Sequence, residues 1–75
     1  MIVYLKIFGG LEGESVGEPA AHDIPQASTI GELLAYSNVS AEKVKILLVN
    51  GIHAEPDAIL KDGDIVSVFP PVAGG

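Results

Sequence analysis

Apolar runs separated by Gly, Pro and Asn signals predict the strands of a small sheet. The first run, residues 2–8, is rich in β-branched and aromatic side chains and ends at Gly9-Gly10, which is typical of a strand that gives way to a turn. The last run, residues 65–69, follows the tight-turn signal Asp62-Gly63-Asp64. Because both runs are nearly all apolar, we expect both strands to lie inside the sheet.

Three weaker strand signals lie between these runs. Residues 45–49 are mostly apolar, and Asn50-Gly51 after them is a strong hairpin signal because both residues tolerate positive φ. The return strand is expected to begin at residues 52–53. A short second strand is expected near residues 22–26, and it should lie at an edge because Pro25 cannot donate a ladder hydrogen bond.

One amphipathic helix is expected to begin at Thr29. Thr29 and Glu32 have the spacing of a capping box, in which the hydroxyl accepts from a first-turn amide and the carboxylate accepts from the amide of the capping residue. The helix is expected to end near residues 37–38, and a weaker turn should follow at residues 40–43. Three apolar side chains then share one helical face: Ile30, Leu33 and Leu34.

The resulting ββαβββ order predicts an α+β fold in which one main helix packs across a mixed sheet. We interpret it as a β-grasp domain of residues 1–69, with the first and last strands parallel, adjacent and central. Residues 11–19 contain three glutamates and two glycines and are expected to form a solvated loop. Residues 70–75 are expected to form an extended, flexible C-terminal tail.

The charge composition narrows the classes of partner. The 75 residues include four lysines, no arginine and ten carboxylates, which give a net charge of −6. Nucleic-acid binding needs clustered basic residues and is therefore not expected, whereas a protein partner with a basic surface is favoured. No run approaches the roughly 20 apolar residues that span a bilayer, so we expect no membrane association and a cytoplasmic location.

The side chains available for chemistry are few. The chain has no cysteine, which removes disulfides, thiolate nucleophiles and iron–sulfur ligands. His22 and His53 lack the Cys or carboxylate spacing of a metal site, so neither a metal nor a bound cofactor is expected. Any sulfur chemistry must therefore use sulfur supplied from outside the chain.

The C-terminal tail carries the most distinctive chemistry. Its terminal carboxylate on Gly75 is a poor electrophile until it is activated, most plausibly as an acyl-adenylate. Because the chain lacks a phosphate-binding glycine loop, a separate enzyme would have to use ATP for this step. The activated carbonyl would then accept sulfur or an amine. The residues expected to insert with it into a narrow channel of a partner are Pro70, Pro71, Val72, Ala73 and Gly74.

These segments together resemble the ubiquitin-like sulfur-carrier family that includes the small subunit of molybdopterin synthase and the thiamine sulfur carrier. The resemblance spans essentially the whole chain and is carried by residues 29–34, 48–51, 60–66 and 69–75. The lead-in Phe69-Pro70-Pro71-Val72 resembles the molybdopterin branch. The resemblance implies a carrier that is not catalytic alone: Gly75 is adenylated by an E1-like enzyme, receives sulfur from a persulfide donor as a thiocarboxylate, and donates it to a pterin precursor in the large synthase subunit.

Other interpretations stay open at this point. Related carriers serve thiamine, cysteine or tungsten-pterin synthesis, and the final sulfur acceptor is set by the partner's pocket. A ubiquitin-like protein modifier would use the same tail to form isopeptides. A pure interaction module would carry an inert tail.

Strand alternation predicts a docking surface opposite the helix. It is formed by Tyr4, Lys6 and Phe8 of the first strand and by Ile65, Ser67 and Phe69 of the last. Lys6 and Ser67 indicate contact with solvent, while the other four side chains keep the surface apolar, so we expect those four to dock a partner. The alternative is a second, minor core beneath the long loop.

Overall fold

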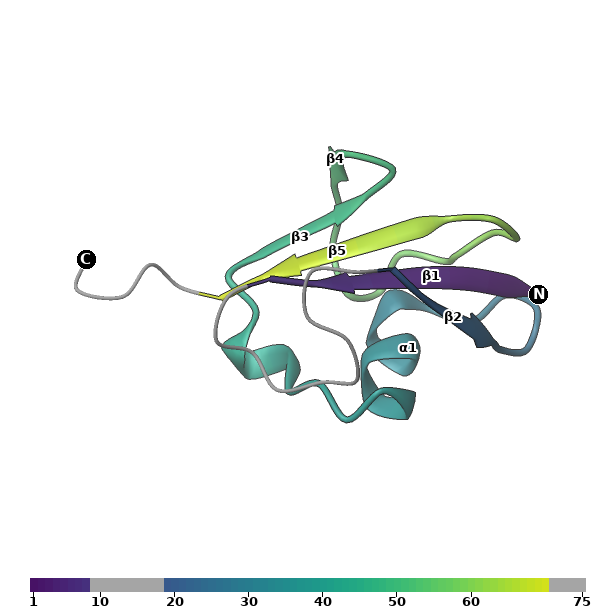
Figure 1. Cartoon of the computed structure of the whole chain (residues 1–75), viewed down its shortest axis with the longest axis horizontal. Helices are drawn as coiled ribbons and strands as arrows, with labels where there is room; N and C mark the ends of the chain where they lie inside the picture. The colour runs from purple at the N-terminus through teal and green to yellow at the C-terminus, as the bar shows by residue number, and fades with distance from the viewer. Residues whose placement is uncertain (9–18, 71–75) are drawn as a thin grey trace.

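The computed structural model describes residues 1–8 and 19–70, and it confirms the predicted ββαβββ order (Figure 1). The elements are β1 (Ile2–Ile7), β2 (Ala20–Asp23), the α-helix α1 (Ile30–Tyr36), the short 3-10 helix η1 (Ala41–Lys43), β3 (Ile46–Val49), β4 (Ile52–His53) and β5 (Ile65–Phe69). Residues 11–18 of the predicted loop lie outside the described residues, as does the predicted tail beyond Pro70.

The five strands form one mixed sheet in the order β2-β1-β5-β3-β4. β1 and β5 pair in parallel, with Tyr4 beside Ile65 and Ile7 beside Val68, whereas the other pairs are antiparallel. The first and last strands are therefore adjacent and inside the sheet, as predicted. α1 and η1 lie on one side of this sheet (Figure 1).

The hydrophobic core lies between α1 and the sheet. Alternate residues of β1 and β5 are at most 1% exposed, and the predicted apolar face of α1 is buried with them. These core side chains are Val3, Leu5 and Ile7 of β1, Val66 and Val68 of β5, and Ile30, Leu33 and Leu34 of α1. Because side chains alternate along a strand, burial of this set turns the intervening residues to the opposite face.

The second strand lies earlier than predicted. It spans Ala20–Asp23 rather than residues 22–26, and Pro25 lies beyond its end. Its antiparallel pairing with β1 sets Asp23 opposite Ile2. Alanine has a low intrinsic preference for strands, so this pairing, rather than local propensity, decides where β2 lies. The predicted edge position is confirmed, since β2 is an outermost strand of the sheet.

α1 begins at the predicted capping box. The Glu32 N–H donates to Thr29 Oγ1 at 3.2 Å, and the Thr29 N–H donates to Glu32 Oε1 at 2.9 Å. Ser37 caps the other end of the helix, and Asn38 after it has a φ of 59°, in the left-handed region that ends helices. Both helix ends therefore agree with the prediction.

Replacement of Thr29 by Ala is expected to lower the free energy of unfolding by about 1 kcal/mol, because the Glu32 amide loses its acceptor. For a domain of this size, the melting temperature should fall by roughly 4–8 °C. Thermal unfolding followed by circular dichroism measures the change. Thr29→Ser keeps the accepting hydroxyl and is the matched control, so equal melting temperatures for the two variants would contradict this role.

Side-chain hydrogen bonds connect two turns near the start of β5, the hairpin turn at residues 50–51 and the turn at residues 61–64. Asn50 and Gly51, with φ of 52° and 82°, form the predicted hairpin turn between β3 and β4. Asn50 Oδ1 accepts from the Ile65 N–H at 3.0 Å, and Asn50 Nδ2 donates to Asp64 Oδ1 at 3.0 Å. Asp64 Oδ2 accepts from the Lys61 N–H at 2.8 Å. These bonds anchor the beginning of the strand that leads to the C-terminal tail.

Candidate functional site: a sheet face that leads to the tail

The face of the sheet opposite α1 carries the residues predicted to dock a partner. Since alternate residues of β1 and β5 point into the core, the residues between them point to this other face. The parallel register sets Tyr4 beside Ile65 and Lys6 beside Ser67. The structure therefore brings the predicted residues of the two strands together on one surface.

β3 extends this surface with residues that the sequence analysis missed. Ile46 pairs with Phe69 and Leu48 pairs with Ser67, so both β3 side chains lie on the same face as their partners. The run ILLV is apolar at every position, and residue type alone therefore hides the alternation. We call this surface the open face, and it comprises Tyr4, Lys6, Phe8, Ile46, Leu48, Ile65, Ser67 and Phe69.

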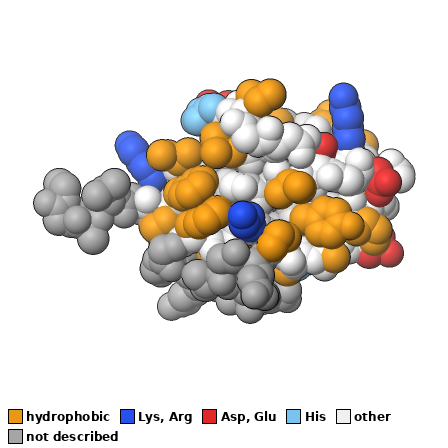
Figure 2. Space-filling view, turned by 45° about the horizontal axis from the view of Figure 1, so that its top comes forward, with side chains coloured by type: hydrophobic (Ala, Val, Ile, Leu, Met, Phe, Trp, Pro, Cys, Tyr) orange, Lys and Arg blue, Asp and Glu red, His pale blue; other side chains and the backbone are white. Residues whose placement is uncertain are grey.

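Three apolar side chains of the open face are exposed to solvent. Tyr4 is 37% exposed, Ile65 is 42% exposed and Ile46 is 44% exposed, whereas core positions of the same strands are at most 5% exposed. Figure 2 shows hydrophobic side chains gathered across the middle of this side of the molecule, with acidic side chains toward its margins. The open face is therefore a predominantly apolar surface.

Two stacked aromatic rings mark one end of the open face. The Phe8 and Phe69 rings have centroids 4.3 Å apart and planes inclined by 9°. Lys6 Nζ lies 5.3 Å from the centroid of the Phe8 ring, which is a cation–π distance. Because β1 and β5 are parallel, both rings lie at the end of the sheet from which Pro70 continues.

Hydrogen bonds hold β5 in place up to the residue where the tail begins. The Phe8 N–H donates to the Val68 carbonyl at 3.0 Å, and the Lys45 N–H donates to the Phe69 carbonyl at 2.7 Å. The attachment point of the tail is thus fixed relative to the open face. The predicted reactive residue Gly75 and the inserting residues Pro71, Val72, Ala73 and Gly74 lie outside the described residues.

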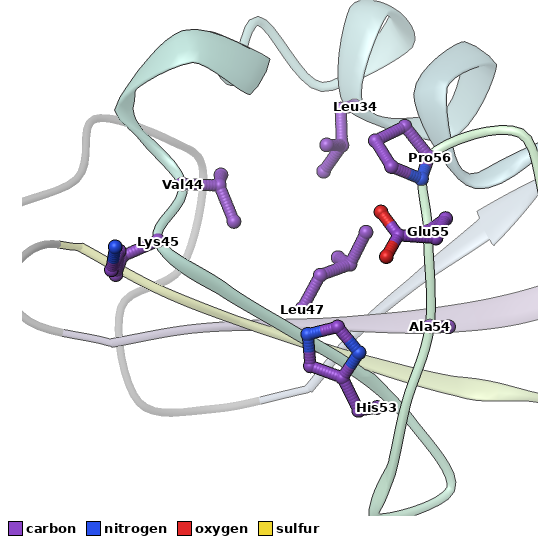
Figure 3. Close-up of a pocket in the computed structure, with 8 residues that line it drawn as sticks. All are labelled: Leu34, Val44, Lys45, Leu47, His53, Ala54, Glu55 and Pro56. Atoms are coloured by element: carbon purple, nitrogen blue, oxygen red, sulfur yellow. The ribbon is translucent and has the colours of Figure 1, made fainter.

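A pocket of about 170 Å³ lies on the helix side of β3 (Figure 3). Apolar side chains from α1 and β3 contribute to it, together with three titratable residues. Its lining is Leu34, Val44, Lys45, Leu47, His53, Ala54, Glu55 and Pro56. Within the described part of the chain, no ion pair joins Lys45, His53 and Glu55.

The two histidines singled out in the sequence lie in different surroundings. His22 on β2 is half-buried, with Nε2 3.5 Å from Ser37 Oγ, whereas His53 on β4 is exposed. Among residues 1–8 and 19–70 there is no group of three or more His, Cys, Asp or Glu side chains that could hold a metal ion. The same residues include no helix long and apolar enough to cross a membrane.

Comparison with known proteins identifies the family of the chain. The model of the ThiS family matches residues 6–75, which is nearly the whole chain. The chain belongs to the ThiS family. The resemblance to the ubiquitin-like sulfur-carrier family is thereby confirmed. No curated protein sequence matches the chain.

Two solved structures share the fold of this ThiS-family chain over the full length of both chains compared. SAMP1 from Haloferax volcanii superposes with a TM-score of 0.72 at 20% sequence identity. A chain from the complex of subunits 1 and 2 of the molybdopterin-converting factor from Helicobacter pylori 26695 superposes with a TM-score of 0.64 at 28% identity. These likenesses confirm the predicted ubiquitin-like β-grasp fold.

Proposed function

We propose that this ThiS-family chain is the sulfur-carrying small subunit of a molybdopterin synthase. The observation that carries the proposal is the C-terminal sequence Phe69-Pro70-Pro71-Val72-Ala73-Gly74-Gly75 on a β-grasp domain of this family. The likeness to a chain of the molybdopterin-converting factor complex supports the molybdopterin branch and a large subunit as partner. In this proposal the chain is a co-substrate that carries sulfur and has no catalytic activity alone.

The Gly75 carboxylate passes through four steps in the proposed cycle. In an E1-like adenylating enzyme, a carboxylate oxygen attacks the α-phosphate of ATP and pyrophosphate leaves. The outer sulfur of a donor persulfide then attacks the acyl carbon, and AMP leaves. A second thiol cleaves the S–S bond, so that the donor becomes a disulfide and Gly75 keeps the sulfur as a thiocarboxylate. Transfer of this sulfur to a pterin precursor in the large subunit, with water, restores the carboxylate.

The composition of the tail suits delivery into a narrow channel. The six residues beyond Phe69 reach at most about 20 Å when fully extended. Pro70-Pro71 favours the extended conformation, and Val72-Ala73 keeps the side chains short. Gly74 and Gly75 add no Cβ atoms around the reacting carbonyl. The acyl carbon can thus enter a partner's active site while the β-grasp domain stays outside.

The open face is the surface that we propose to dock on the adenylating enzyme and the large subunit. Its stacked Phe8 and Phe69 rings, together with the exposed Tyr4 and Ile65, supply apolar contact area. The ring pair adjoins the residue where the tail begins, so a partner that covers this end meets the domain and the tail together. The net charge of −6 favours basic residues around the edge of the partner's docking site.

Intact mass spectrometry tests the proposed function. The chain is incubated with ATP, magnesium, the E1-like adenylating enzyme of the same organism and a persulfide donor. A gain of about 16 Da is expected, because sulfur replaces one carboxylate oxygen. An unchanged mass with the native partners present would contradict the carrier role, and adducts on protein lysines would indicate a protein modifier instead. Sulfur transfer by the large subunit to a pterin precursor then tests the molybdopterin branch.

A further inference from the structure

Lys6 places a positive charge in the middle of the open face. The three inner strands β1, β5 and β3 read IVYLKI, IVSVF and ILLV, and Lys6 is the one charged residue among these described positions. Along β1 it lies between Tyr4 and Phe8, and across the sheet it lies beside Ser67. Its surroundings on this surface are therefore aromatic, aliphatic or hydroxylic.

In the described part of the chain, two carboxylates contact the beginning of β1, at the end of the strand away from Phe8. Asp23 is opposite Ile2, where its Oδ1 lies 3.6 Å from the N-terminal ammonium. Asp62 Oδ1 accepts from the Ile2 N–H at 2.7 Å. Figure 2 shows a lysine near the middle of this side of the molecule with hydrophobic side chains to its left and right, and further lysines and acidic side chains toward the margins. The charge within the open face is thus opposite in sign to the net charge of the chain.

A partner that covers the open face removes water from the Lys6 ammonium. An unpaired charge in such an interface is costly, whereas a carboxylate in direct contact compensates the loss of solvation. A partner that fits must therefore offer an apolar surface with one carboxylate where it meets Lys6.

Resting on the proposed function, we propose that Lys6 determines partner choice by pairing with an Asp or Glu of the protein that receives the tail. Net charge alone favours a partner that is basic throughout. The distribution of charge instead requires an acidic residue opposite the middle of the open face, inside an apolar patch, with basic residues confined to the edge. A surface that presents Lys or Arg at the central point is rejected by repulsion in a site with little water.

The test measures dissociation constants of the full-length chain with two probes, the purified adenylating enzyme and the purified large synthase subunit of the same organism. Lys6→Met keeps much of the apolar stem and removes the charge, and Lys6→Glu reverses it. Lys61→Met and Lys61→Glu are matched controls, because Lys61 is exposed and lies outside the open face. We expect Lys6→Met to weaken binding to at least one probe by about tenfold or more, and Lys6→Glu to weaken it further. Both Lys61 variants should stay within about twofold.

The outcomes separate this inference from the proposed function. If the wild-type chain binds and Lys6→Met loses less than tenfold with both probes, the facing surface is apolar and the inference is overturned, while the carrier role stands. Binding of Lys6→Glu that equals or exceeds that of Lys6→Met also overturns it. If the wild-type chain binds neither probe, the proposed function and the inference both fail. Circular dichroism and thermal unfolding of each variant confirm that the comparison is made between folded chains.

Discussion

Deletion of Gly75 is expected to abolish sulfur transfer while the domain stays folded. The shortened chain still ends in a glycine carboxylate, now on Gly74. It therefore keeps the reactive carboxylate but carries it on a tail that is one residue shorter. One extended residue spans about 3.5 Å. A misplacement of about 1 Å at a reacting centre can lower a rate by about 100-fold, so we expect thiocarboxylation and sulfur transfer to fall by at least that factor.

The intact-mass assay and the transfer assay with the large subunit measure this loss. Thermal unfolding is the control for the fold, and the melting temperature should not change because the deleted residue lies beyond the last strand. Gly75→Ala restores the length of the chain and should recover part of the lost rate. A shortened chain that acquires sulfur as fast as the full chain would remove Gly75 from the mechanism and refute the carrier proposal.

The central part of the fold follows from residue types that allow few alternatives. The run IVYLKI is rich in β-branched side chains and is followed by Gly9-Gly10, so it strongly favours a strand. The capping box of Thr29 and Glu32 determines where the helix begins. Because one helix can cover only one side of a sheet, the alternation along β1 and β5 also predicts which side chains form the open face. These parts of the structure are encoded within short segments of the chain.

Other features depend on contacts between distant residues. β2 lies at Ala20–Asp23 because it pairs with β1, although two alanines favour no strand by themselves. Ile46 and Leu48 join the open face through their register with β5, which a uniformly apolar run does not reveal. The hydrogen bonds from Asn50 to Asp64 and to Ile65 join positions that are 14 and 15 residues apart. The residue types of the two turns predict each turn separately, but they do not predict that side chains connect one turn to the other.

The proposed chemistry of the tail, in contrast, rests on the sequence alone, because it depends on the order of a few residues and not on folding. In that proposal, two prolines, two small residues and two glycines carry the group that is delivered to a partner. The structure adds where this tail begins, beside the stacked Phe8 and Phe69 rings. Which protein binds the chain depends on a complementary surface of that protein. The sequence of this chain predicts only the shape and charge that such a surface must have.

Val66→Asp is expected to unfold the domain. Val66 is 0% exposed between α1 and the sheet, and loss of its burial costs about 1.5–3 kcal/mol. A buried carboxylate without a partner adds several kcal/mol. A domain of this size has a total stability of only about 4–11 kcal/mol. Circular dichroism should therefore show a largely unfolded chain at 25 °C, and a cooperative native-like melt would contradict the position of Val66 in the core.

Ile65→Asp, one residue earlier on the same strand, is expected to separate docking from folding. Ile65 points to the open face and is 42% exposed, so the substitution should cost about 1 kcal/mol of stability and leave a cooperative thermal transition. Binding to the large subunit should weaken by at least about tenfold, because a carboxylate replaces apolar contact area and loses its water in the complex. Unfolding of this variant would mean that Ile65 belongs to the core. Unchanged affinity of the folded variant would mean that the large subunit docks elsewhere on the chain.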